Sequence, residues 1–140
     1  MKRMLSILIG TAAVVLAAAA VAVAASPQSA SVLIRHELKG CHSWAFNGGA
    51  SGAAASGTVA KGGTITVTNT DVMPHTLYQK SGPKAVFQGS PAMAHMSASV
   101  KVSFPKAGVY VFGTKAGEDY TKGVKTIGED NVLILKITVR

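Results

Sequence analysis

The chain has 140 residues, which is enough for one domain of ordinary size. Charged residues make up only 14% and apolar residues 48%, so the chain as a whole is not a disordered charged tail. It contains a single Cys, which cannot pair within the chain, so a disulfide-stabilised scaffold is also excluded.

Residues 1–25 have the features of a secretory signal peptide. Lys2 and Arg3 precede an apolar run that begins at Leu5 and ends in the small residues of 22–25. We expect cleavage of this segment, which leaves residues 26–140 as a single mature domain that is secreted or periplasmic. After cleavage we expect no membrane association.

The positive charge carries little information about partners. Removing Lys2 and Arg3 reduces 14 basic residues to 12 against 6 acidic ones, so the formal net charge falls from +8 to +6. The remaining basic residues are scattered, and no arginine cluster interleaved with aromatic residues occurs. We therefore expect no nucleic-acid partner.

The mature sequence predicts short β-strands rather than helices. Residues 64–68 alternate apolar and polar side chains, as a strand with one buried face does. Residues 105–108 form a turn sequence, with Pro to fix φ and Gly to accept positive φ. Residues 47–57 are low in complexity and are predicted to be a flexible loop. Further strands are expected over 32–38, 100–104, 109–112 and 132–139, and together these elements predict an all-β sandwich.

One motif follows the predicted strand at 64–68. Residues 69–75 read Asn-x-Asp-x-x-Pro-His, which resembles the first-histidine motif of the cupredoxins, the plastocyanin and azurin family of blue-copper proteins. Residues 104–112 resemble the strand–turn–strand that precedes that family's Cys-x-x-His-x-x-Met ligand loop. The resemblance covers most of residues 30–140. It implies a cupredoxin-like Greek-key β-sandwich that holds one copper ion as Cu(I) or Cu(II).

The sequence departs from this family where the ligand loop should stand. Thr114, Gly117 and Tyr120 occupy the positions of the family's Cys, His and Met. None of them offers the thiolate, imidazole or thioether that copper prefers. A longer charged segment, 113–131, replaces the usual loop.

The topology that the resemblance implies brings other soft donors to the metal end of the sandwich. A Cys thiolate with two imidazoles and a weak Met thioether would reproduce the blue-copper ligand set from different loops. Adjacent residues of an extended chain point to opposite faces, so two neighbouring ligands can share an ion only if their loop bends. The candidate metal ligands are Cys41 and His42 on the connecting loop 40–44, His75 in the motif, and His95 and Met96 before the strand at 100–104.

Cys41 and His75 lead this set, and the choice of second imidazole between His42 and His95 stays open. A lone Cys is more often a small buried apolar residue, and Met more often fills a core, so each residue alone also has a purely structural interpretation. His36 stands between charged neighbours in a predicted strand and is expected to be a surface residue.

The sequence thus predicts an exported copper-binding protein with a rearranged Cys/His/Met site that transfers electrons. Its partner would be a redox or copper-exchange protein. Two alternatives are a periplasmic copper storage or delivery protein and a metal-free β-sandwich interaction module with Cys41 buried. No paired carboxylates, Ser-His-Asp grouping or phosphate-binding Gly loop indicates catalysis, so we do not expect an enzyme.

Overall fold

The computed structural model describes residues 25–37, 41–116 and 133–140. The predicted signal peptide lies outside these ranges except for its last residue, and so does most of the charged segment 113–131. Within the described ranges, no helix has the length and apolar character needed to cross a membrane.

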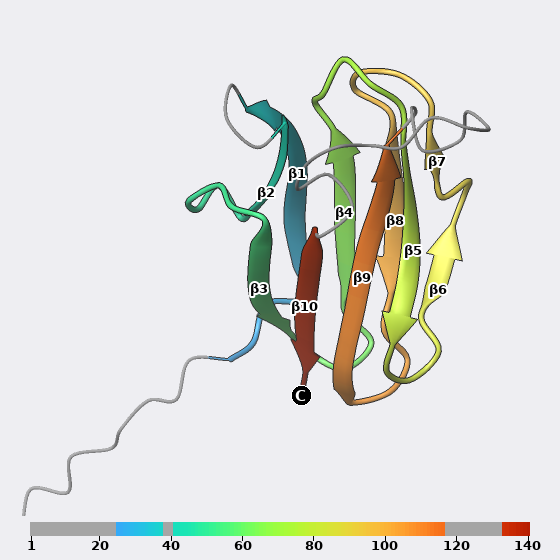
Figure 1. Ribbon diagram of the computed structural model, residues 1–140. Helices are drawn as coiled ribbons and strands as arrows, with labels where there is room; N and C mark the ends of the chain where they lie inside the picture. The colour runs from blue at the N-terminus through green and yellow to red at the C-terminus, as the bar shows by residue number, and fades with distance from the viewer. Residues whose placement is uncertain (1–24, 38–40, 117–132) are drawn as a thin grey trace, which may run out of the picture.

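The described residues form an all-β sandwich of two five-stranded sheets, as predicted (Figure 1). In the first sheet the strands run in the order β2-β1-β4-β8-β6 and in the second β3-β10-β9-β5-β7. Neighbours that are far apart in sequence, such as β4 and β8 or β3 and β10, are typical of Greek-key sandwiches. The first sheet contains β1 (Ser29–Glu37), β2 (Cys41–Phe46), β4 (Thr64–Asn69), β6 (Val86–Gln88) and β8 (Ser99–Ser103). The second contains β3 (Ala54–Val59), β5 (His75–Ser81), β7 (Ala92–Met93), β9 (Gly108–Ala116) and β10 (Ile134–Val139).

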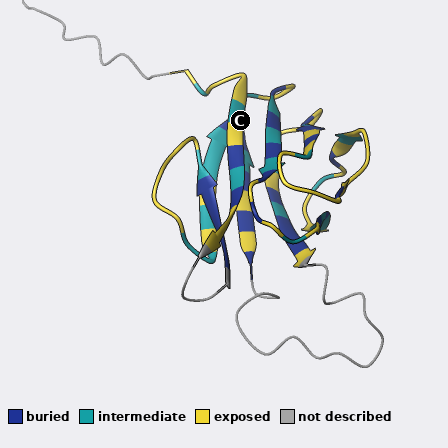
Figure 2. Cartoon of the chain, turned by 90° about the horizontal axis from the view of Figure 1, so that it is seen from above, coloured by how far each residue is buried: buried dark blue, intermediate teal, exposed yellow. Residues whose placement is uncertain are grey.

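The core lies between the two sheets and follows the alternation of the strands. In β4, Ile65 and Val67 are fully buried while the intervening threonines are partly exposed. β8 and β10 alternate in the same way, with buried residues between exposed ones, and Figure 2 shows such alternating bands along the strands. Among the largest buried side chains are Trp44, Phe104 and Tyr110. Removing this apolar surface from water is the main term that stabilises the sandwich.

Two segments predicted as loops are strands in the structure. Residues 54–59 form β3, although 54–57 belong to the predicted loop 47–57. This strand pairs in parallel with β10 along its whole length. Gly57 of β3 leaves room for the ring of Phe46, because a Cβ there would lie 2.1 Å from Phe46 Cζ. The predicted connecting loop 40–44 is also wrong from Cys41 onward, because Cys41–Phe46 is β2 and pairs with β1. Tertiary pairing outweighs the low strand propensity of these segments.

The strand directions bring one set of polar residues to a single end of the molecule. β1 and β4 are parallel neighbours with Ile34 opposite Asn69, so Asp71 follows β4 at the level where His36 lies in β1. β2 returns antiparallel to β1 and places His42 directly opposite His36. His75 begins β5 a few residues beyond Asp71.

Candidate metal centre

The centre of this end is the carboxylate of Asp71, which is fully buried. Asn69 fixes the loop that carries it, because its Oδ1 accepts a hydrogen bond from the Asp71 amide at 2.9 Å. The Asn69 Nδ2 donates to the carbonyl oxygens of Met73 and Met93, at 2.7 and 3.3 Å. The Met73 amide in turn donates to Asp71 Oδ1 at 3.3 Å. These bonds hold the carboxylate at the strand ends.

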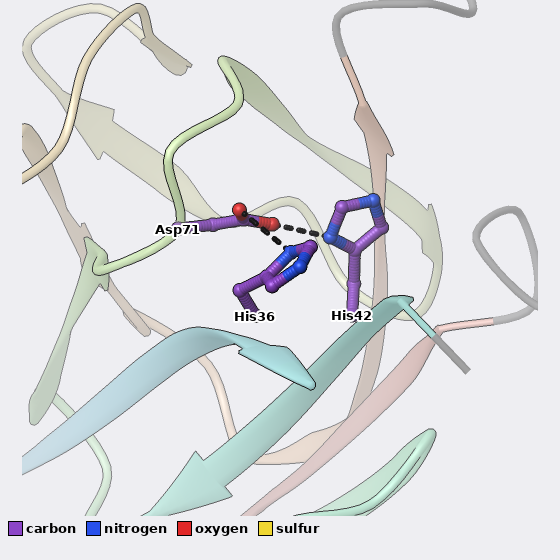
Figure 3. Close-up of side chains that lie close together, drawn as sticks. All are labelled: His36, His42 and Asp71. Carbon is purple, nitrogen blue, oxygen red and sulfur yellow. Dashed lines mark hydrogen bonds and ion pairs between the residues drawn. The ribbon is translucent and has the colours of Figure 1, made fainter. Parts of the chain in front are cut away.

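Three imidazoles surround this one carboxylate. His42 Nδ1 forms a hydrogen bond with Asp71 Oδ2, and His75 Nε2 lies 3.0 Å from the same oxygen. His36 Nδ1 lies 3.3 Å from Asp71 Oδ1. Figure 3 shows His36 and His42 directed at Asp71 from their two strands. The His42 and His75 rings are buried and nearly perpendicular, with centroids 4.6 Å apart, whereas 48% of the His36 side chain is exposed.

The surroundings of Asp71 favour its ionised form. Burial acts to raise the pKa of Asp71, but the hydrogen bond from His75 and that from the Met73 amide act against it. The charge and hydrogen bond of His42 add to this effect, and the pKa of Asp71 is lowered as a result. An ionised carboxylate only accepts hydrogen bonds, so the ring nitrogens that face it act as donors.

This arrangement fixes which nitrogens of the buried histidines carry lone pairs. A neutral imidazole that donates from one nitrogen has its lone pair on the other. With His42 Nδ1 and His75 Nε2 donating to Asp71, the lone pairs are on His42 Nε2 and His75 Nδ1. A carboxylate that holds the far nitrogen is the usual support of metal-binding histidines, because it fixes the ring and increases its basicity. These imidazole donors therefore fit a borderline transition metal such as zinc or copper.

The residues predicted as ligands are not all brought together. His42 and His75 meet at Asp71, from opposite sheets. Cys41 is the first residue of β2, next to His42, and its side chain lies outside the described part of the structure. His95 and Met96 are exposed between β7 and β8, where the ring Nδ1 of His95 lies 2.9 Å from the Met96 carbonyl oxygen. In the described part of the structure, neither has a hydrogen bond or ion pair with Asp71.

Two members of the cluster were missed by sequence reasoning. Asp71 was recognised only as part of the motif at 69–75, without a role of its own. His36 was predicted to be a surface residue and is exposed, but the prediction missed that its Nδ1 lies 3.3 Å from Asp71 Oδ1. A signal was present in the alternation of β1: Val32 and Ile34 are buried, so a period of two puts His36 on the same face.

Of the three positions where the resembled family carries Cys, His and Met, only Thr114 lies in the described residues. Thr114 is buried in β9 and is paired with Leu77 of β5. His75 is paired with Ala116, two residues further along the same two strands. Its Oγ1 has no hydrogen-bond partner among the described residues. A hydroxyl therefore lies near His75 in place of a soft donor. Gly117 and Tyr120 lie outside the described ranges.

The sequence matches no protein-family model and no curated protein. Similar solved structures include a purple cupredoxin from Nitrosopumilus maritimus, with 17% identity over 79% of this chain and 99% of that chain and a TM-score of 0.49. Amicyanin from Paracoccus versutus has 18% identity over 85% of this chain and 86% of its own, with a TM-score of 0.46. An amicyanin variant in its Cu(I) form has 17% identity over 81% and 83% of the two chains, with a TM-score of 0.46. Each likeness is low in identity and concerns the arrangement of strands, so the function has to be inferred from the residues of this chain.

Proposed function

We propose that this protein is an exported, cupredoxin-like copper-binding protein that holds one ion, as Cu(I) or Cu(II), in a rearranged site and transfers electrons. The observation that supports this best is the convergence of two buried imidazoles, His42 and His75, on one buried carboxylate at the end of the sandwich. Such a set is costly to bury without a role, because charged and polar groups lose their hydration there.

In this proposal Cys41, His42 and His75 supply the main donors. His42 would bind through Nε2 and His75 through Nδ1, since Asp71 holds the other nitrogen of each ring. The Cys41 thiolate would add the soft ligand that distinguishes a copper site of this type. Cys41 is the first residue of β2, and sharing an ion with His42 would require the chain to bend there, because adjacent strand residues point to opposite faces.

Met96 and His95 are the remaining proposed ligands. Both side chains are exposed in the described structure. Binding to the same ion would withdraw them from solvent. The Met96 thioether would be a weak ligand, of the kind that adjusts the potential of a copper site.

The scaffold suits electron transfer because the ligand supports are held by hydrogen bonds rather than by the ion. Asn69 fixes the loop of Asp71, and Asp71 fixes both buried rings. Donors that keep their positions in both oxidation states lower the reorganisation on redox change. When bound, copper supplies the one-electron couple, and the chain supplies geometry, a low-dielectric surround and exclusion of water. The partner would be a redox or copper-exchange protein in the periplasm or outside the cell.

Titration of the reduced, purified protein with Cu(II) tests this proposal. We expect one equivalent to bind with an intense thiolate-to-copper absorption in the visible, and we expect Cys41→Ser to abolish that absorption. His75→Ala should weaken binding by at least about 10-fold, as loss of a supported ligand does. An unchanged band in Cys41→Ser would contradict the assignment. Equilibrium dialysis without copper uptake would point instead to a metal-free interaction module.

Copper storage or delivery is a second candidate function, and the position of His36 favours it. His36 contacts Asp71 while 48% of its side chain is exposed, so the cluster has one member in contact with solvent and available for metal exchange. Tight binding of Cu(I) without a stable coloured Cu(II) form would support delivery over electron transfer.

A further inference from the structure

We propose that His36, His42 and Asp71 form a divalent-cation site of their own, with two imidazole nitrogens and one carboxylate oxygen as donors, that takes Zn(II) or Cu(II) and does not require Cys41. These three side chains come from two neighbouring strands and the loop after a third (Figure 3). Of the main donors of the proposed copper site, which are Cys41, His42 and His75, this site shares only His42.

The spacing of the three donors matches that of ligands around one ion. One ring nitrogen from each histidine and one Asp71 oxygen all lie within 4.8 Å of one another. His36 Nδ1 is 3.3 Å from Asp71 Oδ1, and His42 Nδ1 contacts Asp71 Oδ2. Zinc binds nitrogen and oxygen at about 2.0–2.2 Å, so two ligands of a tetrahedral ion lie roughly 3.3 Å apart. The ring nitrogens of His36 and His42 that face Asp71 carry protons when no ion is bound, so binding requires these protons to move to the far ring nitrogens. The side chains themselves then need only small shifts to surround an ion.

The local structure holds these donors in place before any ion binds. His36 and His42 face each other in the register of β1 and β2. Asp71 is fixed by the hydrogen bonds of Asn69 and Met73 described above. Preorganisation of this kind reduces the ordering cost of binding.

The donor types and their burial define the class of ion. Two imidazoles and one carboxylate, with a further position open to water, form a set that suits zinc and also Cu(II). His42 and Asp71 are buried, while the half-exposed His36 gives the ion a path from solvent. The carboxylate supplies the negative charge that offsets a divalent cation at a largely buried position.

The two proposed sites share His42 through different nitrogens. The site with His36 uses His42 Nδ1, whereas the copper site uses His42 Nε2. A neutral imidazole has one lone pair, so the ring serves one ion at a time. Zinc bound at the His36 side would therefore compete with the copper–thiolate site, and the two proposals can fail independently.

The test is a calorimetric titration of the reduced full chain with Zn(II), repeated for three variants. We expect one zinc ion to bind the unchanged chain and His36→Ala to weaken binding by about 10-fold or more. Gln88→Ala is the matched control, because it removes an exposed polar side chain of β6 that belongs to neither proposed site, and it should bind zinc as the unchanged chain does. Cys41→Ser should also bind zinc with unchanged affinity. His36 is half-exposed, and circular dichroism of each variant checks that the sheets are retained.

Unchanged zinc affinity in His36→Ala, loss of binding in Cys41→Ser, or no binding by the unchanged chain would each overturn the site. Co(II) substitution gives a second readout, since we expect ligand-field bands without an intense thiolate-to-cobalt absorption. A strong thiolate band would overturn the proposal even if zinc binds. The copper proposal is tested separately, because it fails if the copper–thiolate absorption is unchanged in Cys41→Ser.

Discussion

The two ends of the sandwich are closed by different chemistry. At the turn between β8 and β9, the rings of Phe104 and Tyr110 pack with centroids 4.8 Å apart, and the Tyr110 hydroxyl donates to the Lys106 carbonyl oxygen at 2.7 Å. At the other end, buried Asp71 is surrounded by three imidazoles. One end shows that apolar packing and a neutral hydrogen bond suffice to close this fold. A buried charge costs several kcal/mol in desolvation, so the Asp71 end is better explained by binding than by stability.

The largest effect is expected from Asp71→Asn. The amide keeps the shape of the side chain but turns an NH2 group toward ring nitrogens that donate to the carboxylate in the native protein. We expect the free energy of unfolding to fall by about 3 kcal/mol, because buried donors lose their acceptor. Chemical denaturation of the reduced, metal-free protein measures this. A variant as stable as the native chain would show that the cluster does not have the hydrogen bonds described here.

A smaller loss is expected from Asn69→Ala, which removes the support of the Asp71 loop. The Asn69 side chain makes three hydrogen bonds to backbone groups at a buried position, so we expect a loss of about 2 kcal/mol and weaker zinc binding. Gln88→Ala is a suitable control, since Gln88 is an exposed polar residue of β6 and should change stability by less than about 0.5 kcal/mol. Equal effects of the two substitutions on the denaturation midpoint would contradict this account of the loop.

Tyr110→Phe examines the opposite end. It removes the hydrogen bond to Lys106 and keeps the aromatic packing on Phe104, so a loss of about 1 kcal/mol is expected. Zinc and copper affinities should not change, because the substitution leaves the Asp71 cluster intact. A drop in metal affinity comparable to that of Asn69→Ala would remove the distinction between the two ends.

The smallest effect is expected in acid. The pKa of Asp71 in the folded protein is below the ordinary aspartate value of 3.8. Well above pH 3.8 the carboxylate is therefore ionised in both the folded and the unfolded state, and its full contribution to stability is present. As the pH falls below about 3.8, the unfolded state takes up the proton first, and the contribution of Asp71 is lost as the pH approaches its folded pKa. The stability difference between the native chain and Asp71→Asn should therefore shrink over that range in urea titrations. A stability difference that grew as the pH fell would contradict a lowered pKa of Asp71 in the folded protein.

Strands with alternating apolar and polar residues could be predicted from the sequence. A strand that forms only because it pairs with a neighbouring strand could not. Residues 64–68 alternate apolar and polar side chains, and β4 shows that pattern of burial. β3 has the small residues Ala, Ser, Gly and Thr, which give no strand signal, and it becomes a strand by pairing with β10. Its Gly57 accommodates the Phe46 ring, a contact that only the assembled structure reveals.

The site was predictable to a similar, partial degree. The motif and the expected topology indicated that His42 and His75 lie at one end, and the structure places both there on Asp71. The roles of His36 and Asp71 depend on the register of β1 with β2 and with β4, which places His36 opposite His42 and level with Asp71. Strand register is a tertiary property, because a shift of one residue would turn His36 to the other face.

X-ray absorption at the copper edge tests the central claim most directly, because it counts the atoms bound to the metal. For the protein loaded with one equivalent of copper we predict one thiolate sulfur and at least two imidazole nitrogens at roughly 2.0–2.3 Å, the usual range for such bonds in proteins. The sulfur should disappear in Cys41→Ser, and one imidazole should disappear in His75→Ala. A copper ion surrounded only by nitrogen and oxygen in the native protein would contradict the proposed copper–thiolate site.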